Sequence, residues 1–127
     1  MEEDNRLQTE IGNIESETLK PKAVLIIGSR IQEVSKDNKK IGEKVVLICK
    51  HPDKEEHLEV SKVKFLKNDK VTTSGLWFNL DDNKEILKIS ALAKTLNFNN
   101  VTNIGSLVGK TLETDLDANG YLCIKAY

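Results

Sequence analysis

The sequence predicts a mainly β protein, a barrel of five to six antiparallel strands with one short helix. Three observations predict it. Apolar and polar residues alternate in several segments, as they do in strands that bury one face. One segment instead spaces its apolar residues as a helix does, and an Asn-Gly hairpin signal lies near the C-terminus. With 127 residues, 39% of them hydrophobic, the chain can form one compact domain.

Strands form the first half of this domain. Residues 22–34 contain many β-branched side chains, one glycine and no proline, which favours a long first strand. A second strand is expected at residues 43–50 and ends before Pro52, because proline has no backbone donor. In a third strand, residues 58–66, the apolar side chains change from one face to the other, so we expect a β-bulge near Ser61.

The second half contains a helix and a hairpin. Residues 75–80 alternate again and indicate a strand segment. A helical stripe with Ser90 as its expected N-cap follows, and its apolar members are Ile89, Leu92, Ala93 and Leu96. A further helical turn is expected at residues 103–107. Residues 110–117 and 121–127 alternate and are joined by a turn that ends in Asn-Gly, so they predict a closing hairpin.

This order of elements, three strands, a helix and a final hairpin, is that of the OB-fold. The OB-fold is a five-stranded Greek-key barrel, and its helix is expected between strands three and four. A small antiparallel α+β sandwich and another kind of small barrel are the competing arrangements. We expect a single OB-like barrel domain over residues 20–127.

An acidic arm precedes this domain. Residues 1–19 carry six acidic side chains and one arginine, a net charge of −5, whereas residues 20–70 carry a net charge of +5 and residues 71–127 a net charge of −1. The arm also contains three apolar residues at helical spacing, Leu7, Ile11 and Ile14, which are compatible with an N-terminal helix. The arm has three interpretations: a solvated tail, a tether between molecules, or a lid on the basic surface.

The same composition excludes several classes of protein. No segment reaches the roughly 20 apolar residues of a membrane span, and the acidic start of the chain does not resemble a secretory signal. We therefore expect a cytoplasmic protein with both cysteines reduced. A net charge of −1 excludes a protein that binds nucleic acid merely because it is basic.

The sequence gives little support to an enzyme. It contains no phosphate-binding loop, no dinucleotide-binding glycine pattern, no nucleophile elbow and no zinc-protease helix. Tetrahedral zinc would require the fold to gather Cys49, His51, His57 and Cys123. Their spacing lacks the usual paired cysteines, and a cysteine in a strand is more often a small buried apolar residue. We predict a non-enzymatic protein with no metal and no cofactor.

Lysines and a single tryptophan form the main candidate site. Lys62 and Lys64 alternate along the third strand, and Trp77 faces away from its apolar neighbours. The neighbouring strands add three basic side chains, Arg30, Lys44 and Lys50. OB barrels bind single strands by stacking bases on aromatic side chains while Lys and Arg contact phosphates. In the opposing interpretation, a loop at residues 67–74 or the acidic arm covers the indole, and the lysines protect a strand edge.

A second basic and aromatic group lies in the final hairpin. Tyr121, Lys125 and Tyr127 share one face of the last strand. Glu113 and Asp115 of the preceding strand share that face, and their charges would repel phosphate. Pairing of Lys125 with an acid across the strands is the simpler expectation.

Residues 42–127 also carry features of a known group of proteins. These are the strand at residues 43–50, SGLWFNLDDN at residues 74–83, the short helix, and LVGKTLETDLDANGYLCIKAY at residues 107–127. In these features the chain resembles small OB-type proteins of phage and archaeal replication or recombination loci. The resemblance implies binding of single-stranded DNA beside a replication or recombination protein.

We therefore predict a non-enzymatic module that binds single-stranded nucleic acid, with DNA favoured over RNA. The alternative is a protein-interaction or oligomerisation module, such as a homodimer or an adaptor. Exposed strand edges and the amphipathic acidic arm favour this alternative.

Overall fold

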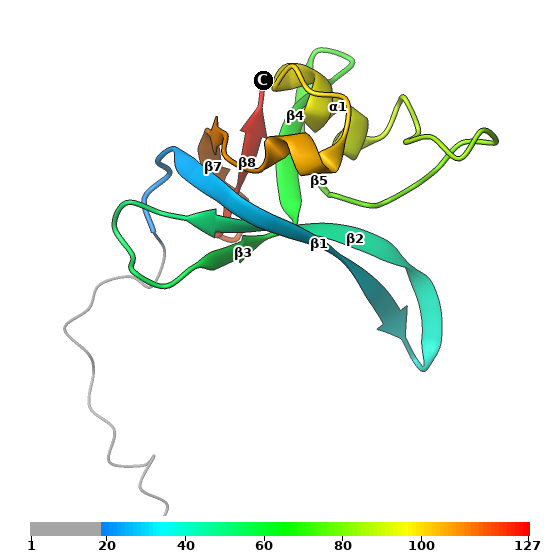
Figure 1. Ribbon diagram of the computed structural model, residues 1–127, viewed down its shortest axis with the longest axis horizontal. Helices are drawn as coiled ribbons and strands as arrows, with labels where there is room; N and C mark the ends of the chain where they lie inside the picture. Colours follow the sequence, from blue (N-terminus) through cyan, green and yellow to red (C-terminus); the bar gives the residue numbers. More distant parts are fainter. Residues whose placement is uncertain (1–18) are drawn as a thin grey trace, which may run out of the picture.

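The computed structural model describes residues 19–127, which form a mainly β structure (Figure 1). Within these residues there are eight strands, one α-helix and one short 3₁₀ helix: β1 (Val24–Lys36), β2 (Lys39–Lys50), β3 (Leu58–Val60), β4 (Lys62–Lys67), β5 (Lys70–Gly75), α1 (Ala91–Phe98), η2 (Ile104–Leu107), β6 (Thr111–Leu112), β7 (Thr114–Leu116) and β8 (Leu122–Ala126). The expected N-terminal helix falls on residues 1–18 and lies outside the described part of the chain. None of the helices within residues 19–127 is long and apolar enough to cross a membrane.

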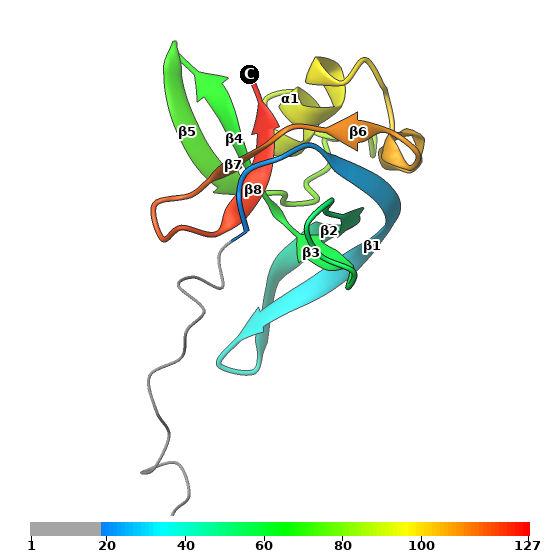
Figure 2. The same ribbon diagram turned by 90° about the vertical axis from the view of Figure 1, so that its left-hand side faces the viewer.

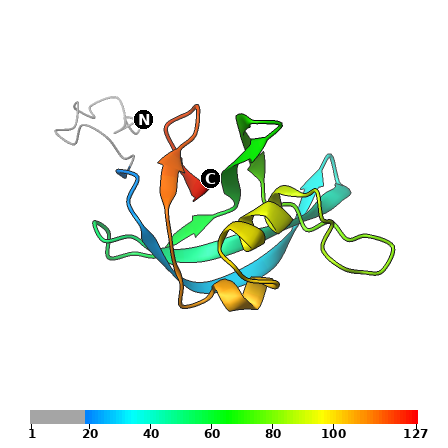
Figure 3. The same ribbon diagram turned by 90° about the horizontal axis from the view of Figure 1, so that it is seen from above.

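The strands form two four-stranded sheets that curl into a half-barrel. Their orders are β3-β2-β1-β6 and β5-β4-β8-β7. Only Ser61 separates β3 from β4, and only Glu113 separates β6 from β7, so the chain passes directly from one sheet to the other at these two residues. Figure 3 shows the strands curving around a common interior, and α1 packs against β4 and β8.

One hydrophobic core lies between the sheets and the helix. Alternate residues of the strands face it, so that side chains such as Val45 and Leu47 of β2 and Val63 of β4 are fully buried. Leu92 and Leu96 of α1 join the same cluster. The predicted alternation holds only in part, because β2 buries Val45, Val46 and Leu47 in succession and β8 buries both Cys123 and Ile124.

Two hairpins have turns made by residues with positive φ. Asp37 and Asn38, with φ of 53° and 64°, join β1 to β2. Asn68 and Asp69, with φ of 51° and 64°, join β4 to β5 in the same way. Two central residues with positive φ match the right-handed twist of the flanking strands. The β1–β2 hairpin stays paired to its tip, with a register shift between Val34 and Ser35, and extends beyond the rest of the molecule (Figures 1 and 2).

The predicted strand count of five to six and the predicted place of the helix are wrong. Eight strands are present within residues 19–127, and α1 follows β5 rather than the third strand. Single residues interrupt two of the expected strands, which raises the count. Residues 67–74 were expected to be a loop, but most of them form β5. Of the expected strand at residues 75–80, Gly75 ends β5, and the rest contributes the isolated bridges of Trp77 to Lys44 and Leu80 to Ile86.

Other local expectations are confirmed. The Ser90 hydroxyl caps α1 by accepting a hydrogen bond of 3.1 Å from the Ala93 N–H. Gly120, with φ of 83°, completes the closing hairpin. Val60 and Val63 are both buried, so the apolar side chains do change face around Ser61. The cause is the passage of the chain between the two sheets, so the β-bulge expected near Ser61 is wrong.

Candidate nucleic-acid interface

Trp77 packs on the outer surface of β2. Hydrogen bonds of 2.8 Å on either side of it, from the Val45 N–H to the Leu76 carbonyl and from the Phe78 N–H to the Glu43 carbonyl, hold this segment against the strand. The indole covers Gly42, since a Cβ atom there would lie 3.1 Å from the ring. The side chain remains partly exposed. The sheet therefore supports one part of the indole and leaves another part open to solvent.

Lys44 connects this tryptophan with the second sheet. Its ammonium lies 4.7 Å from the centroid of the Trp77 ring, within the range of a cation–π interaction. Its stem also passes over Gly75, where a Cβ atom would lie 2.8 Å from the lysine Cε and 3.1 Å from the indole nitrogen. Gly75 is paired in register with Lys62 of β4. The structure thus brings Trp77, Lys44 and Lys62 together on one outer surface.

Lys62 and Lys64 each have a carboxylate partner from the closing hairpin. The Lys62 ammonium lies 3.5 Å from Asp117, and the Lys64 ammonium lies 3.4 Å from Asp115. Backbone N–H groups, together with these lysines, lower the pKa of both carboxyl groups, so both stay ionised at neutral pH. The two lysines share the outer surface with Trp77 but are held by ion pairs.

Arg30 and Lys50 have different surroundings from this group. In register, Arg30 is opposite Val46, which shares a face of β2 with Lys44. Its guanidinium makes two hydrogen bonds of 2.7 Å to Glu59, which hold the pKa of that carboxyl below its usual range. Lys50 lies at the far end of β2, about 20 Å along the strand from Lys44.

Tyr127 is a surface aromatic side chain that the sequence interpretation left outside the site. The ammonium of Lys125 lies 5.0 Å from the centroid of the Tyr127 ring. The Tyr127 hydroxyl donates a hydrogen bond of 3.2 Å to Asp115. The expected pairing of Lys125 with an acid is absent within the described residues, because Lys64 lies beside Asp115 instead. Lys64 and Lys125 are paired in register. The spacing of Lys125 and Tyr127 along the last strand was the sequence signal for this second aromatic position.

The cysteines and the histidines do not form a common cluster. Cys49 is buried in one sheet and Cys123 in the other. Burial raises the pKa of the Cys49 thiol to about 12. The ring of His51 is buried, with Nδ1 accepting from the Asp53 N–H and Nε2 2.7 Å from the Lys20 carbonyl oxygen. Within residues 19–127, no three His, Cys, Asp or Glu side chains gather as a metal site would require.

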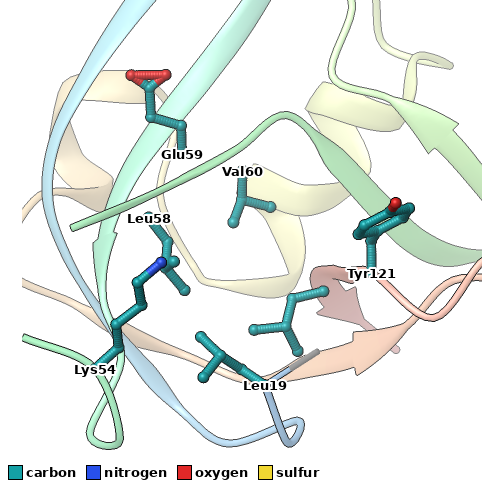
Figure 4. A pocket seen from close by; sticks show the side chains of 7 residues that line it. Leu19, Lys54, Leu58, Glu59, Val60 and Tyr121 are labelled. Atoms are coloured by element: carbon teal, nitrogen blue, oxygen red, sulfur yellow. The ribbon is translucent and has the colours of Figure 1, made fainter. Parts of the chain in front are cut away.

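Two surface depressions lie apart from Trp77. The smaller, of about 200 Å³, lies where the described chain begins, and Figure 4 shows the side chains of Leu19, Leu58 and Val60 lining it. The larger, of about 670 Å³, lies between α1 and the segment that precedes it and is lined by Phe78 and Ile86. Both are mainly apolar, and neither gathers the buried polar groups that fix a small ligand.

Comparisons of this chain with protein-family models, with curated proteins and with solved structures find no match. The function is therefore inferred from the geometry of the chain itself.

Proposed function

We propose that this protein is a non-enzymatic OB-fold module that binds single-stranded nucleic acid, with DNA favoured, on the outer surface around Trp77. The observation that carries the proposal is the partly exposed indole with the Lys44 ammonium 4.7 Å from its ring centroid. Within residues 19–127, no carboxylate lies within ion-pair distance of that ammonium. An aromatic platform beside an uncompensated positive charge suits a stacked base and its phosphate.

The strand pairing supports an OB-like arrangement. If β3 with β4 and β6 with β7 are each counted as one bent strand, and β5 as an added hairpin strand, five strands remain, and the helix falls between the third and the fourth. The ligand surface of an OB-fold is centred on strands two and three. In this chain those strands are β2 and β3–β4, which carry Lys44, Lys62 and Lys64.

The ion pairs on this surface set the expected strength of binding. The Lys62–Asp117 and Lys64–Asp115 pairs are largely covered, so a phosphate must compete for these lysines with carboxylates that backbone N–H groups also hold in place. A base stacked on Trp77 would contribute roughly 1–3 kcal/mol. Arg30 is expected to contribute less than the lysines, because a phosphate would have to displace two short hydrogen bonds to Glu59. We expect weak binding without sequence preference.

Anisotropy of a labelled oligonucleotide tests this proposal. Trp77→Ala should weaken binding about 5- to 150-fold, which corresponds to the loss of one stacked base. Tyr121→Ala is the matched control, since Tyr121 is 67% exposed and lies outside the group around Trp77. Equal effects of the two substitutions would refute the stacking role. No binding at low salt would refute the function and favour the alternative of an interaction module without nucleic acid.

A further inference from the structure

The outer side of β5 has no neighbour within the described residues. β5 is the first strand of the order β5-β4-β8-β7, and Figure 2 shows it as the outermost strand on its side of the half-barrel. The outer part of β1 is also paired on one side only, but it carries Arg30 and Glu33 and has two register irregularities. Charges and bulges of this kind protect a strand edge from pairing.

β5 lacks such protection. From Val71 to Gly75 it contains no charged residue and no proline, and its pairing with β4 is continuous from one end to the other. Val71 and Leu66, which are paired in register, are 51% and 48% exposed. An uncharged, regular strand edge beside exposed apolar side chains is a ready template for another strand.

The hydrogen-bond pattern shows which backbone groups of β5 are open. The Leu76 N–H donates to the Ser61 carbonyl over 2.8 Å, which makes these two residues a hydrogen-bonded pair of the antiparallel ladder. Because such pairs alternate along a ladder, Ser74 and Thr72 also bond to β4. The N–H and carbonyl groups of Val71, Thr73 and Gly75 therefore point outward, and the Gly75 carbonyl already accepts one hydrogen bond, from the Ser74 hydroxyl over 3.2 Å.

We propose that β5 pairs with β5 of a second copy of this chain, antiparallel and about a two-fold axis at Thr73. The axis brings Thr73 opposite Thr73 of the second copy and Val71 opposite Gly75 of the second copy. Each outward N–H then faces an outward carbonyl of the other copy, so both hydrogen bonds of each residue pair can form. The one charged residue, Lys70, then lies at the ends of the new ladder, about 20 Å from its symmetry mate. Lys44 of each copy lies beside this ladder, over Gly75.

A second copy fits this edge because the edge is complementary to itself. Val71 of one copy comes opposite Gly75 of the other, the residue over which Lys44 and Trp77 lie. Val71 of one copy therefore lies beside the Lys44 stem and the indole of the other copy. The interface is small, so the association is reversible and depends on concentration.

Sedimentation equilibrium of the full chain without nucleic acid tests this inference, which does not depend on the proposed function. The expected mass rises with concentration from 14.3 kDa toward twice that value. Thr73→Pro removes an outward N–H and leaves the bonds to β4 in place, so it should weaken association tenfold or more. Thr73→Val, which keeps the N–H and the β-branched shape, is the control and should associate as the unaltered chain does.

Val71→Lys provides a second variant should proline disturb the hairpin. It brings a positive charge beside Lys44 of the second copy and should weaken association to a similar extent. Either of two results would overturn the inference: a mass that stays at that of one chain up to the solubility limit, or equal association of Thr73→Pro, Val71→Lys and Thr73→Val.

Discussion

Gly75→Ala is the substitution that tests the geometry around Trp77 with the smallest chemical change. Its Cβ would lie 2.8 Å from the Lys44 Cε and 3.1 Å from the indole nitrogen. Ordinary carbon contacts are about 3.5–4.0 Å, so the lysine stem must move by about 1 Å. That movement separates the Lys44 ammonium from the Trp77 ring.

The expected magnitudes follow from this displacement. An exposed cation–π interaction is worth about 0.5–1 kcal/mol, which is about 2- to 5-fold in an equilibrium constant. Replacing glycine in a strand gains a similar amount, because the unfolded chain loses conformational freedom. The free energy of unfolding should therefore stay within about 1 kcal/mol of its original value, whereas oligonucleotide affinity should fall about 2- to 5-fold.

Urea unfolding measures the free energy of unfolding. Titration with an oligonucleotide, followed by the emission of the single tryptophan, measures the affinity. Gly28→Ala is the matched control on the outer surface of the β1–β2 hairpin, where a Cβ would make only an ordinary contact of 3.5 Å with Ile48. It should leave both the emission and the affinity unchanged. If Gly75→Ala also leaves both unchanged, Lys44 and Trp77 do not act together, and the described geometry of the site is wrong.

Three further predictions concern the stability and reactivity of the fold. His51→Ala should cost about 2–4 kcal/mol in urea unfolding, because it leaves a cavity and two unpaired backbone groups, whereas His57→Ala, at an exposed position, should cost less than about 0.5 kcal/mol. In the folded chain the pKa of Asp115 lies below its ordinary value of 3.8. The stability that this carboxylate contributes is thus present above pH 3.8 and is lost as the pH falls further, so Asp115→Asn should flatten the acid loss of stability below about pH 4. Burial and the raised thiol pKa of Cys49 and Cys123 should keep both from reacting with an alkylating reagent until the chain unfolds; rapid labelling of the native protein would contradict their placement.

The sequence predicted local elements well where a side chain bonds to nearby backbone. Ser90 caps its helix within three residues, and Asn119 and Gly120 form their turn within the hairpin. Such signals require no knowledge of distant residues. The short helix and the closing hairpin were therefore found at nearly their observed positions.

β5 escaped prediction because its residues give no periodic signal. Lys70–Gly75 contains one strongly apolar residue, Val71, which points to the exposed side. Its turn also lacks glycine and proline, since Asn68 and Asp69 supply the positive φ. A strand that buries few side chains shows no alternation of apolar and polar residues.

The partners of the site lysines could not be predicted for a different reason. Lys62 meets Asp117 across 55 residues of sequence, through the pairing of β4 with β8 and of β8 with β7. Alternation indicates that both side chains face outward, but only the strand order determines that they meet. The sequence therefore predicted the exposed lysines but not the ion pairs that hold them.

Emission of Trp77, the only tryptophan, during titration with an oligonucleotide of about 15 nucleotides tests the central claim most directly. We expect quenching that saturates. Contacts from Lys44, Lys62 and Lys64 to phosphates give a salt slope of about −2, so affinity should fall about 15-fold between roughly 50 and 200 mM salt. Emission that does not change with oligonucleotide at the lower salt concentration would contradict a nucleic-acid surface at this tryptophan.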